Sequence, residues 1–265
     1  MLNYYVADAF ADNIFEGNPA GVCIMDEWIT EEEMDKIARE NNLSETAFAV
    51  KEGDHYGLRW FTPGGEVDLC GHATLATAYI LFRFVETDTN ILHFNTKMKN
   101  YHLVVIKKDD LYEMDFPTSI PEKYHLTDLM VEALGATPIE VLKTDRDLIF
   151  NFDSENTVKN LTPNFSKMKK FPEGLSVFVT AKSEKYDFVA RAFWPKINID
   201  EDPVCGSMYC CLIPYWRERN GLDKMVARQV SKRGGTVYCE YCGDRVKISG
   251  RAALYAIGNI CVDEK

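Results

Sequence analysis

A buried helix is predicted between Ala73 and Phe84, a run of twelve residues in which Arg83 is the one charge. A helix that is apolar on every face must be surrounded by other structure. The run follows an aromatic-rich strand, Leu58 to Phe61, and a turn, and it is preceded directly by Cys70-Gly71-His72. The pattern therefore predicts a central helix whose N-terminal end carries titratable side chains.

The rest of the chain alternates short apolar strands with few helices. Thr30 and Glu33 form a capping box for a helix from Glu31 to about Glu40, and a second short helix, Thr127 to Leu134, ends at Gly135. Residues 155–170 are predicted to be helical, and residues 15–21 a turn-rich loop. Strands are predicted at 3–9, 47–51, 57–61, 91–95, 101–107, 111–115, 139–143, 147–152, 175–181, 187–194, 227–230, 236–241, 245–249 and 252–257. This pattern favours an α+β fold of barrel or sandwich type over a βαβ sheet.

The opening pattern occurs a second time. Arg59-Trp60-Phe61-Thr62-Pro63 is echoed by Arg191-Ala192-Phe193-Trp194-Pro195, and Cys70-Gly71-His72 is echoed by Cys205-Gly206-Ser207. The second tripeptide opens another apolar helix, from Met208 to about Tyr215. Such a repeat predicts two similarly folded halves, each a sheet wrapped round one helix. We expect these halves at 1–116 and 117–265, with the last strand a candidate for return to the first half.

The charge and the hydropathy narrow the class of partner. The chain carries 41 acidic and 30 basic side chains, a formal charge of −11, which argues against nucleic acid or an anionic membrane surface. It contains no run of about 18 apolar residues and no signal-peptide pattern at its N-terminus, so we expect neither a membrane span nor export. Eight cysteines without an export signal indicate reduced thiols in a cytoplasmic protein.

The two helix N-termini are candidate anion sites. Unpaired N–H groups and the positive end of the dipole favour a bound anion there, and Gly71 and Gly206 would allow a ligand to approach the backbone. Two such ends facing each other would hold a carboxylate-bearing substrate. The alternative is that both glycines only serve tight turns before helices.

Three side chains are candidates for moving protons. His72 lies in the first turn of its helix, where the dipole should lower the pKa of an imidazole and favour its neutral form. Asp202 precedes the second Cys-Gly and could act either as a cap or in catalysis. Glu45 stands at the start of an apolar strand, where partial burial can suit a carboxyl group to general acid/base work.

Cys70 and Cys205 form a rival arrangement. Two thiols at equivalent positions of two halves are what a two-base racemase or epimerase requires, and a helix N-terminus depresses the pKa of a thiol. Both could instead be small buried apolar residues. Cys239 and Cys242 form a single CxxC without a second ligand pair, so we expect no metal site there.

At this point a set of segments, taken in order, resembles a known family. They are FEGNPAGV (15–22), NLSETAF (42–48), FTPGGEVDLCGHATLA (61–76), EDPVCGS (201–207) and QVSKRGG (229–235). The chain resembles the phenazine-biosynthesis PhzF-like isomerase family along nearly its whole length. The resemblance implies a diaminopimelate epimerase-like fold, with two homologous halves and an active site in the cleft between them.

The resemblance also implies roles for individual residues. A well-understood member is a cofactor-independent isomerase that moves a proton within a dihydro-hydroxyanthranilate ring. By analogy, Glu45 is the general acid/base and His72 and Asp202 assist it. The residues that hold the substrate are Ser44, Gly71, Gly206 and Ser207. The resemblance implies no cofactor and no metal, and a homodimer.

The second motif departs from the family pattern. Many members have DPVTGSAH, whereas this chain has DPVCGSMY, so Cys205, Met208 and Tyr209 change the wall of the expected pocket. Cys205 also restores the paired thiols of the epimerases. Three hypotheses therefore stand: an isomerase using Glu45, a racemase or epimerase of an amino or hydroxy acid using Cys70 and Cys205, and a non-catalytic carboxylate-binding protein.

Overall fold

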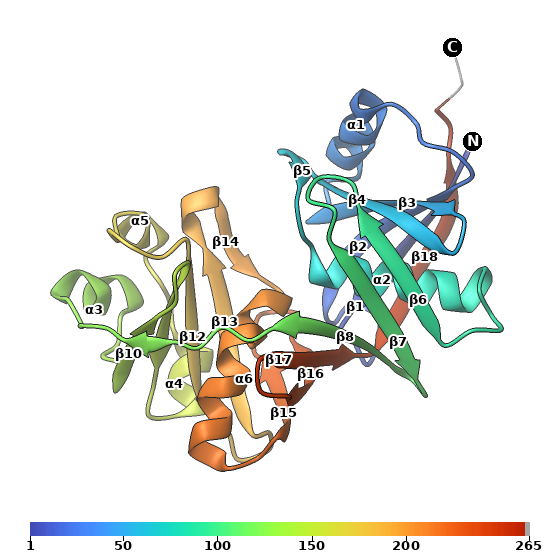
Figure 1. The fold of residues 1–265 in the computed structure, drawn as a ribbon. Coiled ribbons are helices and arrows are strands. Elements are labelled where there is room, and N and C mark those ends of the chain that lie inside the picture. The colour runs from blue at the N-terminus through green and yellow to red at the C-terminus, as the bar shows by residue number, and fades with distance from the viewer. Residues whose placement is uncertain (263–265) are drawn as a thin grey trace. The chain divides into compact units, whose positions relative to one another are not determined.

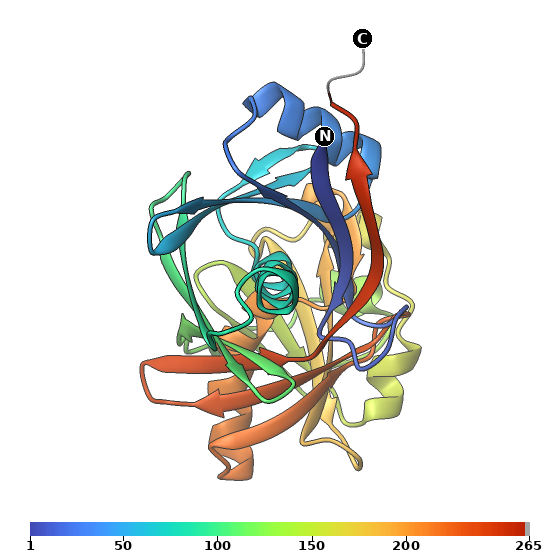
Figure 2. The same cartoon turned by 90° about the vertical axis from the view of Figure 1, so that its right-hand side faces the viewer.

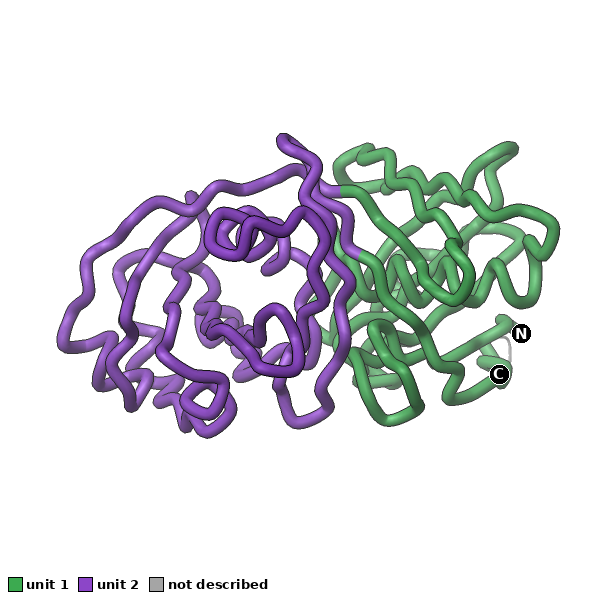
Figure 3. Tube along the Cα trace, turned by 90° about the horizontal axis from the view of Figure 1, so that it is seen from below, with its two compact units in different colours: residues 1–115, 249–265 green, residues 116–248 purple. Residues whose placement is uncertain are grey.

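The computed structural model describes residues 1–262 of the chain. It divides into two compact units (Figure 3). The first unit comprises Met1–Asp115 together with the segment that starts at Ser249, and the second comprises Phe116–Ile248. Each unit contains one long buried helix and a set of strands (Figure 1).

The first unit is built on strands that run in sequence around one helix. Its elements are β1 (Leu2–Ala9), β2 (Asn18–Met25), α1 (Glu31–Asn41), β3 (Glu45–Glu52), β4 (His55–Thr62), β5 (Gly65–Val67), α2 (Gly71–Phe84), β6 (Ile91–Thr96), β7 (His102–Lys108), β8 (Leu111–Pro117) and β18 (Ala252–Ile260). β2 pairs antiparallel with β1 and parallel with β3, and β4 pairs antiparallel with β3 and parallel with β6. The last strand, β18, pairs antiparallel with the first, β1.

Helix α2 is the centre of the first unit. Figure 2 shows it end-on with the strands of the unit around it. Every residue from His72 to Phe82 is buried, as its all-apolar pattern predicts. The hydroxyls of Thr74 and Thr77 are satisfied within the helix, by the carbonyls of Cys70 and Ala73 at 2.6 and 2.7 Å.

The second unit repeats this order of strand pairings. Its elements are β9 (Glu122–Lys123), α3 (Asp128–Leu134), β10 (Glu140–Lys143), β11 (Asp147–Asn151), α4 (Glu155–Asn160), α5 (Phe165–Met168), β12 (Ser176–Lys182), β13 (Phe188–Trp194), the 3₁₀ helix η1 (Pro195–Ile197), β14 (Ile199–Asp202), α6 (Gly206–Asn220), β15 (Lys224–Gln229), β16 (Gly235–Tyr241) and β17 (Arg245–Gly250). β11 pairs parallel with β12, and β13 pairs antiparallel with β12 and parallel with β15. These are the pairings of β2, β3, β4 and β6 in the first unit.

Helix α6 is longer than the sequence pattern predicts, because it continues through Pro214 to Asn220 and ends at Gly221. A proline inside a helix leaves the carbonyl four residues earlier without its usual donor. Here that carbonyl, on Cys210, accepts a hydrogen bond from the backbone N–H of Ser119 at 3.0 Å. The interruption is thus satisfied from outside the helix, which allows it to run on.

The capping residues in the sequence predict the ends of helices correctly, whereas the strand at residues 18–25 was not predicted. The capping box of Thr30 and Glu33 is present, and Thr127 and Gly135 bound α3 as expected. The predicted loop over 15–21 is wrong in its second half, because β2 begins at Asn18. Residues 155–170 form two short helices, α4 and α5, rather than one. Within residues 1–262, none of the helices has the length and apolar character that crossing a membrane requires.

Candidate active site

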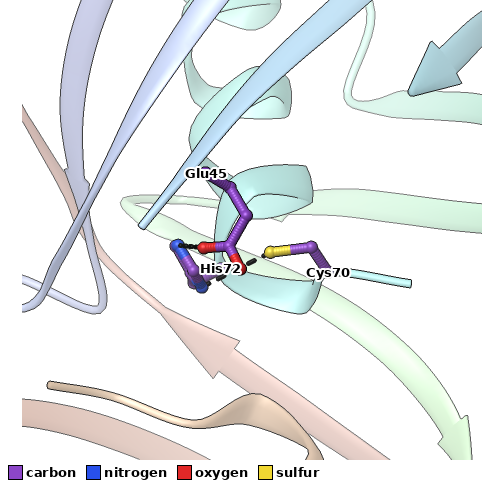
Figure 4. Close-up of side chains that lie close together, drawn as sticks. All are labelled: Glu45, Cys70 and His72. Atoms are coloured by element: carbon purple, nitrogen blue, oxygen red, sulfur yellow. Dashed lines mark hydrogen bonds and ion pairs between the residues drawn. The ribbon is translucent and has the colours of Figure 1, made fainter. Parts of the chain in front are cut away.

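Glu45 and His72 meet at the N-terminal end of α2. Glu45 is the first residue of β3 and His72 is the second residue of α2. Carboxylate Oε2 of Glu45 lies 3.0 Å from imidazole Nε2 of His72, and the two side chains are 15 and 7% exposed (Figure 4). Within residues 1–262, neither atom has a hydrogen-bond partner elsewhere. The two groups therefore face each other in a largely dry environment.

The other ring nitrogen of His72 contacts two further side chains. Amide Nδ2 of Asn18 lies 3.3 Å from Nδ1, and Sγ of Cys70 lies 3.5 Å from the same atom. The hydroxyl of Ser44 is 3.5 Å from Oδ1 of Asn18. Asn18 reaches this position because β2 and β3 run parallel, with Ala20 opposite Glu45 in the register. His72 is thus held between Glu45 on one side and Asn18 and Cys70 on the other.

The protonation of His72 differs from the sequence expectation. Burial lowers its pKa, but the neighbouring Cys70 and the charge and hydrogen bond of Glu45 outweigh burial and raise the pKa well above the ordinary value for histidine. The expected lowering by the helix dipole is therefore wrong. A carboxylate in contact stabilises an imidazolium more strongly than the partial charge of a helix end opposes it. The arrangement favours an imidazolium–carboxylate pair.

The two motif thiols are also less acidic than a helix N-terminus predicts. Both are buried, and burial raises the pKa of Cys70 and, more strongly, that of Cys205. The negative charges of Glu45 and Asp202 add to these two shifts respectively. The expected depression of the thiol pKa is therefore wrong, because desolvation of the thiolate exceeds the stabilisation that the helix end supplies.

The second unit presents its own set of motif residues at the start of α6. Cys205 is the N-cap residue, Gly206 and Ser207 open the helix, and Asp202 ends β14. Gln229, which is fully buried, fixes this segment from β15. Its amide oxygen accepts from the backbone N–H of Cys205 at 2.9 Å, and its amide nitrogen donates to the backbone carbonyl of Asp202 at 2.6 Å.

Arg146 anchors Ser207 from the other side. Its Nη2 donates to the hydroxyl of Ser207 at 3.0 Å, while Nε and Nη2 bind the carboxylate of Asp147 at 2.9–3.0 Å. Asp147 is buried and also accepts from the hydroxyl of Ser176 at 2.5 Å. The guanidinium lies over the ring of Trp194. The third residue of Cys-Gly-X thus contacts a side chain at or directly before the start of a strand in both units: Asn18, the first residue of β2, for His72, and Arg146, directly before β11, for Ser207.

The predicted residues accordingly fall into two groups. Glu45, Cys70, Gly71, His72 and Ser44 lie together in the first unit, and Asp202, Cys205, Gly206 and Ser207 lie together in the second. The residues that sequence reasoning missed are Asn18, Arg146 and Gln229. Asn18 and Gln229 lie inside segments that carry the family resemblance, which could have pointed to them. Nothing in the sequence connects Arg146 with Ser207, because the two residues are 61 positions apart in the chain.

One combination of side chains could hold a metal ion. Glu45, Cys70 and His72 each offer one ligand atom, and these atoms all lie within 4.8 Å of one another. In the described residues Cys239 and Cys242 belong to no such group, and Cys242 is exposed while Cys239 is buried. A hollow of about 510 Å³ in the second unit, lined by residues that include Tyr124, Glu140 and Arg219, contains none of the candidate residues.

Comparison with known proteins gives three results. The chain is 46% identical to an uncharacterized isomerase of Pseudomonas aeruginosa over 259 residues, 98% of each chain. The crystal structure of a phenazine biosynthesis protein of the PhzF family from Enterococcus faecalis is 47% identical, with a TM-score of 0.96 over 99% of this chain and 100% of that one. A probable proline racemase from Agrobacterium radiobacter shares the fold alone, at 10% identity and a TM-score of 0.63 over 99% of this chain and 94% of that one.

The fold is thus the mixed α+β, diaminopimelate epimerase-like one that the repeat and the resemblance predict. The model of the phenazine biosynthesis-like proteins matches residues 7–258, which is nearly all of the chain and includes every candidate residue. A relative that is 46% identical over 98% of this chain supports the same family assignment. The chain belongs to the phenazine biosynthesis-like (PhzC-PhzF) protein family.

Proposed function

We propose that the protein is a cofactor-independent isomerase that moves a proton on a small carboxylated substrate. The relative from Pseudomonas aeruginosa bears the name of an isomerase, which supports the reaction class. The observation that carries the finer proposal is the contact of Glu45 Oε2 with His72 Nε2 at 3.0 Å, two buried atoms that have no hydrogen-bond partner elsewhere within the described residues. A carboxylate group in such a position can take up a proton and give it back.

In the proposed reaction Glu45 is the base and then the acid. A carboxylate oxygen removes a proton from a substrate carbon, and the electron pair of the C–H bond moves into the conjugated system that includes the neighbouring double bond. Glu45 then returns the proton to the carbon at the far end of that system, so that atoms and charge balance. His72 keeps the carboxylate oriented through their contact at 3.0 Å. Asp202 is proposed to assist from the second unit.

Substrate binding is assigned to the helix ends and the residues beside them. The backbone N–H groups at the start of α2 and α6 offer donors for a carboxylate, next to Gly71 and Gly206. Ser44 and Ser207 add hydroxyl groups. The protein is further proposed to be cytoplasmic and a homodimer. Light scattering would show a dimer as a mass twice the 30.3 kDa of the chain.

Hydrogen exchange in heavy water tests the proposal. A panel of small carboxylates that includes a dihydro-hydroxyanthranilate is incubated with the enzyme in D₂O, and deuterium at carbon is measured by mass spectrometry. We expect exchange with the wild type and a loss of about 10²–10⁴-fold in Glu45→Gln. Glu52→Gln, at the other end of β3, is the matched control and should keep full activity. Full activity of Glu45→Gln would refute the role of Glu45.

The two-thiol mechanism is the alternative that this experiment also examines. It requires Cys70 and Cys205 as bases, and the raised pKa of both thiols weighs against a thiolate at neutral pH. If Cys205→Ser abolished exchange while Glu45→Gln retained it, the racemase or epimerase hypothesis would replace ours. Binding of a carboxylate without exchange at any carbon would instead indicate a non-catalytic binding protein.

A further inference from the structure

Three different metal-binding side chains converge at the N-terminal end of α2. They are the Cys70 thiol, the His72 imidazole and the Glu45 carboxylate, and Figure 4 shows them pointing toward one another. Their ligand atoms lie within 4.8 Å of one another, and both Cys70 and His72 are 6% exposed. The set is unusual for a proton-transfer site, because a carboxylate and an imidazole would suffice for that chemistry. The thiol has no part in the proposed reaction.

The spacing of sulfur and nitrogen matches that of two zinc ligands. Zn–S and Zn–N bonds of about 2.3 and 2.0–2.1 Å at a tetrahedral angle place the two ligand atoms about 3.5 Å apart. Sγ of Cys70 and Nδ1 of His72 are 3.5 Å apart. An ion could therefore replace the proton that these two atoms now share without moving either side chain far. The thiol and the imidazole come from a single turn, the N-cap and second residue of α2, which fixes their separation.

We propose that Glu45, Cys70 and His72 form a Zn²⁺ site, and that Zn²⁺ inhibits the protein by occupying its proton-transfer groups. On binding, the Cys70 thiol loses its proton to solvent and the thiolate joins the metal through sulfur, while the His72 imidazolium loses its Nδ1 proton to solvent. Nδ1 of His72 supplies the second bond. The Glu45 carboxyl group supplies the third by turning away from Nε2, which leaves the fourth position to water. The inhibition, though not the binding, rests on the proposed function.

The donor set also defines which ions should bind. A thiolate and an imidazole favour Zn²⁺ and Co²⁺, whereas Mg²⁺ and Ca²⁺ prefer all-oxygen sites. Amide Nδ2 of Asn18 lies 3.3 Å from Nδ1 of His72, so this side chain must shift slightly to admit the ion. In the second unit Ser207 stands where the first has His72, and among residues 1–262 Cys205 belongs to no group of three metal-binding side chains. The repeat therefore offers one such site, not two.

Co²⁺ provides a direct probe, since a tetrahedral thiolate complex has visible and near-ultraviolet absorption bands. Metal-free protein is titrated with Co²⁺ and then with Zn²⁺, which should displace it. We expect one ion per chain, with the sulfur-to-cobalt band abolished in Cys70→Ser and affinity reduced at least about tenfold in His72→Gln. Mg²⁺ at the same concentration should leave the spectrum unchanged.

The matched control is Cys242→Ser, which removes an exposed thiol distant from the cluster in sequence and outside the described metal-binding group. It should bind Co²⁺ as the wild type does. Circular dichroism shows whether each variant is folded. If Cys70→Ser is not folded, His72→Gln is used in its place to test the site. Binding that survives both substitutions, or is lost in Cys242→Ser, would refute the site and indicate surface thiols. The absence of stoichiometric binding would refute it equally.

The inhibition is measured separately, by adding Zn²⁺ to the exchange assay in D₂O. Activity should fall in proportion to site occupancy and return when EDTA removes the metal. Exchange that continues at full occupancy overturns the inhibitory role. Because the cobalt spectrum needs no turnover, metal binding in a protein that exchanges no substrate would support the site while contradicting the isomerase proposal.

Discussion

Arg191 and Glu201 are joined by two parallel hydrogen bonds, at 2.7 Å from Nε and 3.0 Å from Nη2. Arg59 and Glu66 are joined in the same way in the first unit, at 2.7 Å each. Each arginine also lies over a phenylalanine two residues later, at 5.1 Å for Phe61 and 5.0 Å for Phe193. Each pair ties together the two strands that lead to a Cys-Gly helix, β4 to β5 and β13 to β14.

The two arginines should differ in their effect on stability. Nη1 of Arg191 also donates to the carbonyls of Val158 and Leu161, at 3.1 and 2.9 Å, whereas the further partner of Arg59 is the exposed Glu31. A lysine can form neither the two parallel hydrogen bonds to the carboxylate nor the additional bonds that the guanidinium makes to these backbone carbonyls. We expect Arg191→Lys to lower the free energy of unfolding by about 2–3 kcal/mol and Arg59→Lys by about 1 kcal/mol. Urea unfolding measures both, and equal losses would contradict this reasoning.

His72 should make stability depend on pH. Its pKa is raised in the folded protein, so the folded state holds a proton that the unfolded state releases above about pH 6.5. Stability from this group is fully present below that pH and is lost as pH rises through the folded-state pKa. The expected slope is up to about 1.4 kcal/mol per pH unit. Urea unfolding of the wild type and of His72→Gln between about pH 6 and about pH 8 measures the contribution of His72 to this slope. Ordinary thiols ionise above that range and so do not contribute to the difference. Parallel curves for the two proteins would contradict the raised pKa.

Asn18 should control the protonation of His72. Asn18→Asp would place a second carboxylate on the Nδ1 side of the ring, opposite Glu45, and raise the pKa of His72 further. Asn18→Leu adds desolvation of the ring without adding a charge, so the pKa of His72 should be lower in Asn18→Leu than in Asn18→Asp. An NMR titration of the imidazole gives the order of the His72 pKa values in the three proteins, with the signal assigned by its absence in His72→Gln. The same pKa in all three proteins would show that Asn18 only fills space.

Arg146 should matter for both stability and the placement of Ser207. Arg146→Met leaves the buried Asp147 with the Ser176 hydroxyl but without its cationic partner. We expect a loss of about 1–3 kcal/mol in the free energy of unfolding. Arg146→Lys, which keeps the charge, should lose less. In the exchange assay Arg146→Met should raise KM more than it lowers kcat, because Ser207 is assigned to substrate binding. A loss in kcat alone would contradict that assignment.

Sequence reasoning succeeded where the signal is local. The capping box of α1, the C-terminal glycine of α3 and the all-apolar α2 depend on residues within a few positions of one another. The repeat added the long-range information that the two Cys-Gly helices are equivalent. β2 was missed because Asn18-Pro19-Ala20-Gly21 has the composition of a turn. Its strand conformation comes from pairing with β1 and β3 on both sides.

The motifs named candidate residues of the site, but they did not predict the pKa shifts of those residues. Glu45 and His72 were named from the motifs, whereas their contact at 3.0 Å is a consequence of the fold. A helix N-terminus can be recognised in the sequence, and it predicts a lowered pKa for His72. The carboxylate of Glu45, whose effect on that pKa is larger, stands 27 positions earlier in the chain. The same limit explains Arg146, which lies 61 positions before Ser207. Distances through space between such residues leave no trace in one sequence.

The pairing of β18 with β1 reverses the order in which the two units can be completed during synthesis. Residues 116–248 contain the whole second unit, so it has all its parts once they have left the ribosome. The first unit, although translated first, lacks one of the two partners of β1 until residues 252–260 emerge, because β1 pairs with β18 as well as with β2. Until then one edge of β1 is open to foreign strands. The half that carries Glu45 and His72 is therefore the last to mature, and a nascent chain halted before its final strand should be neither active nor safe from aggregation.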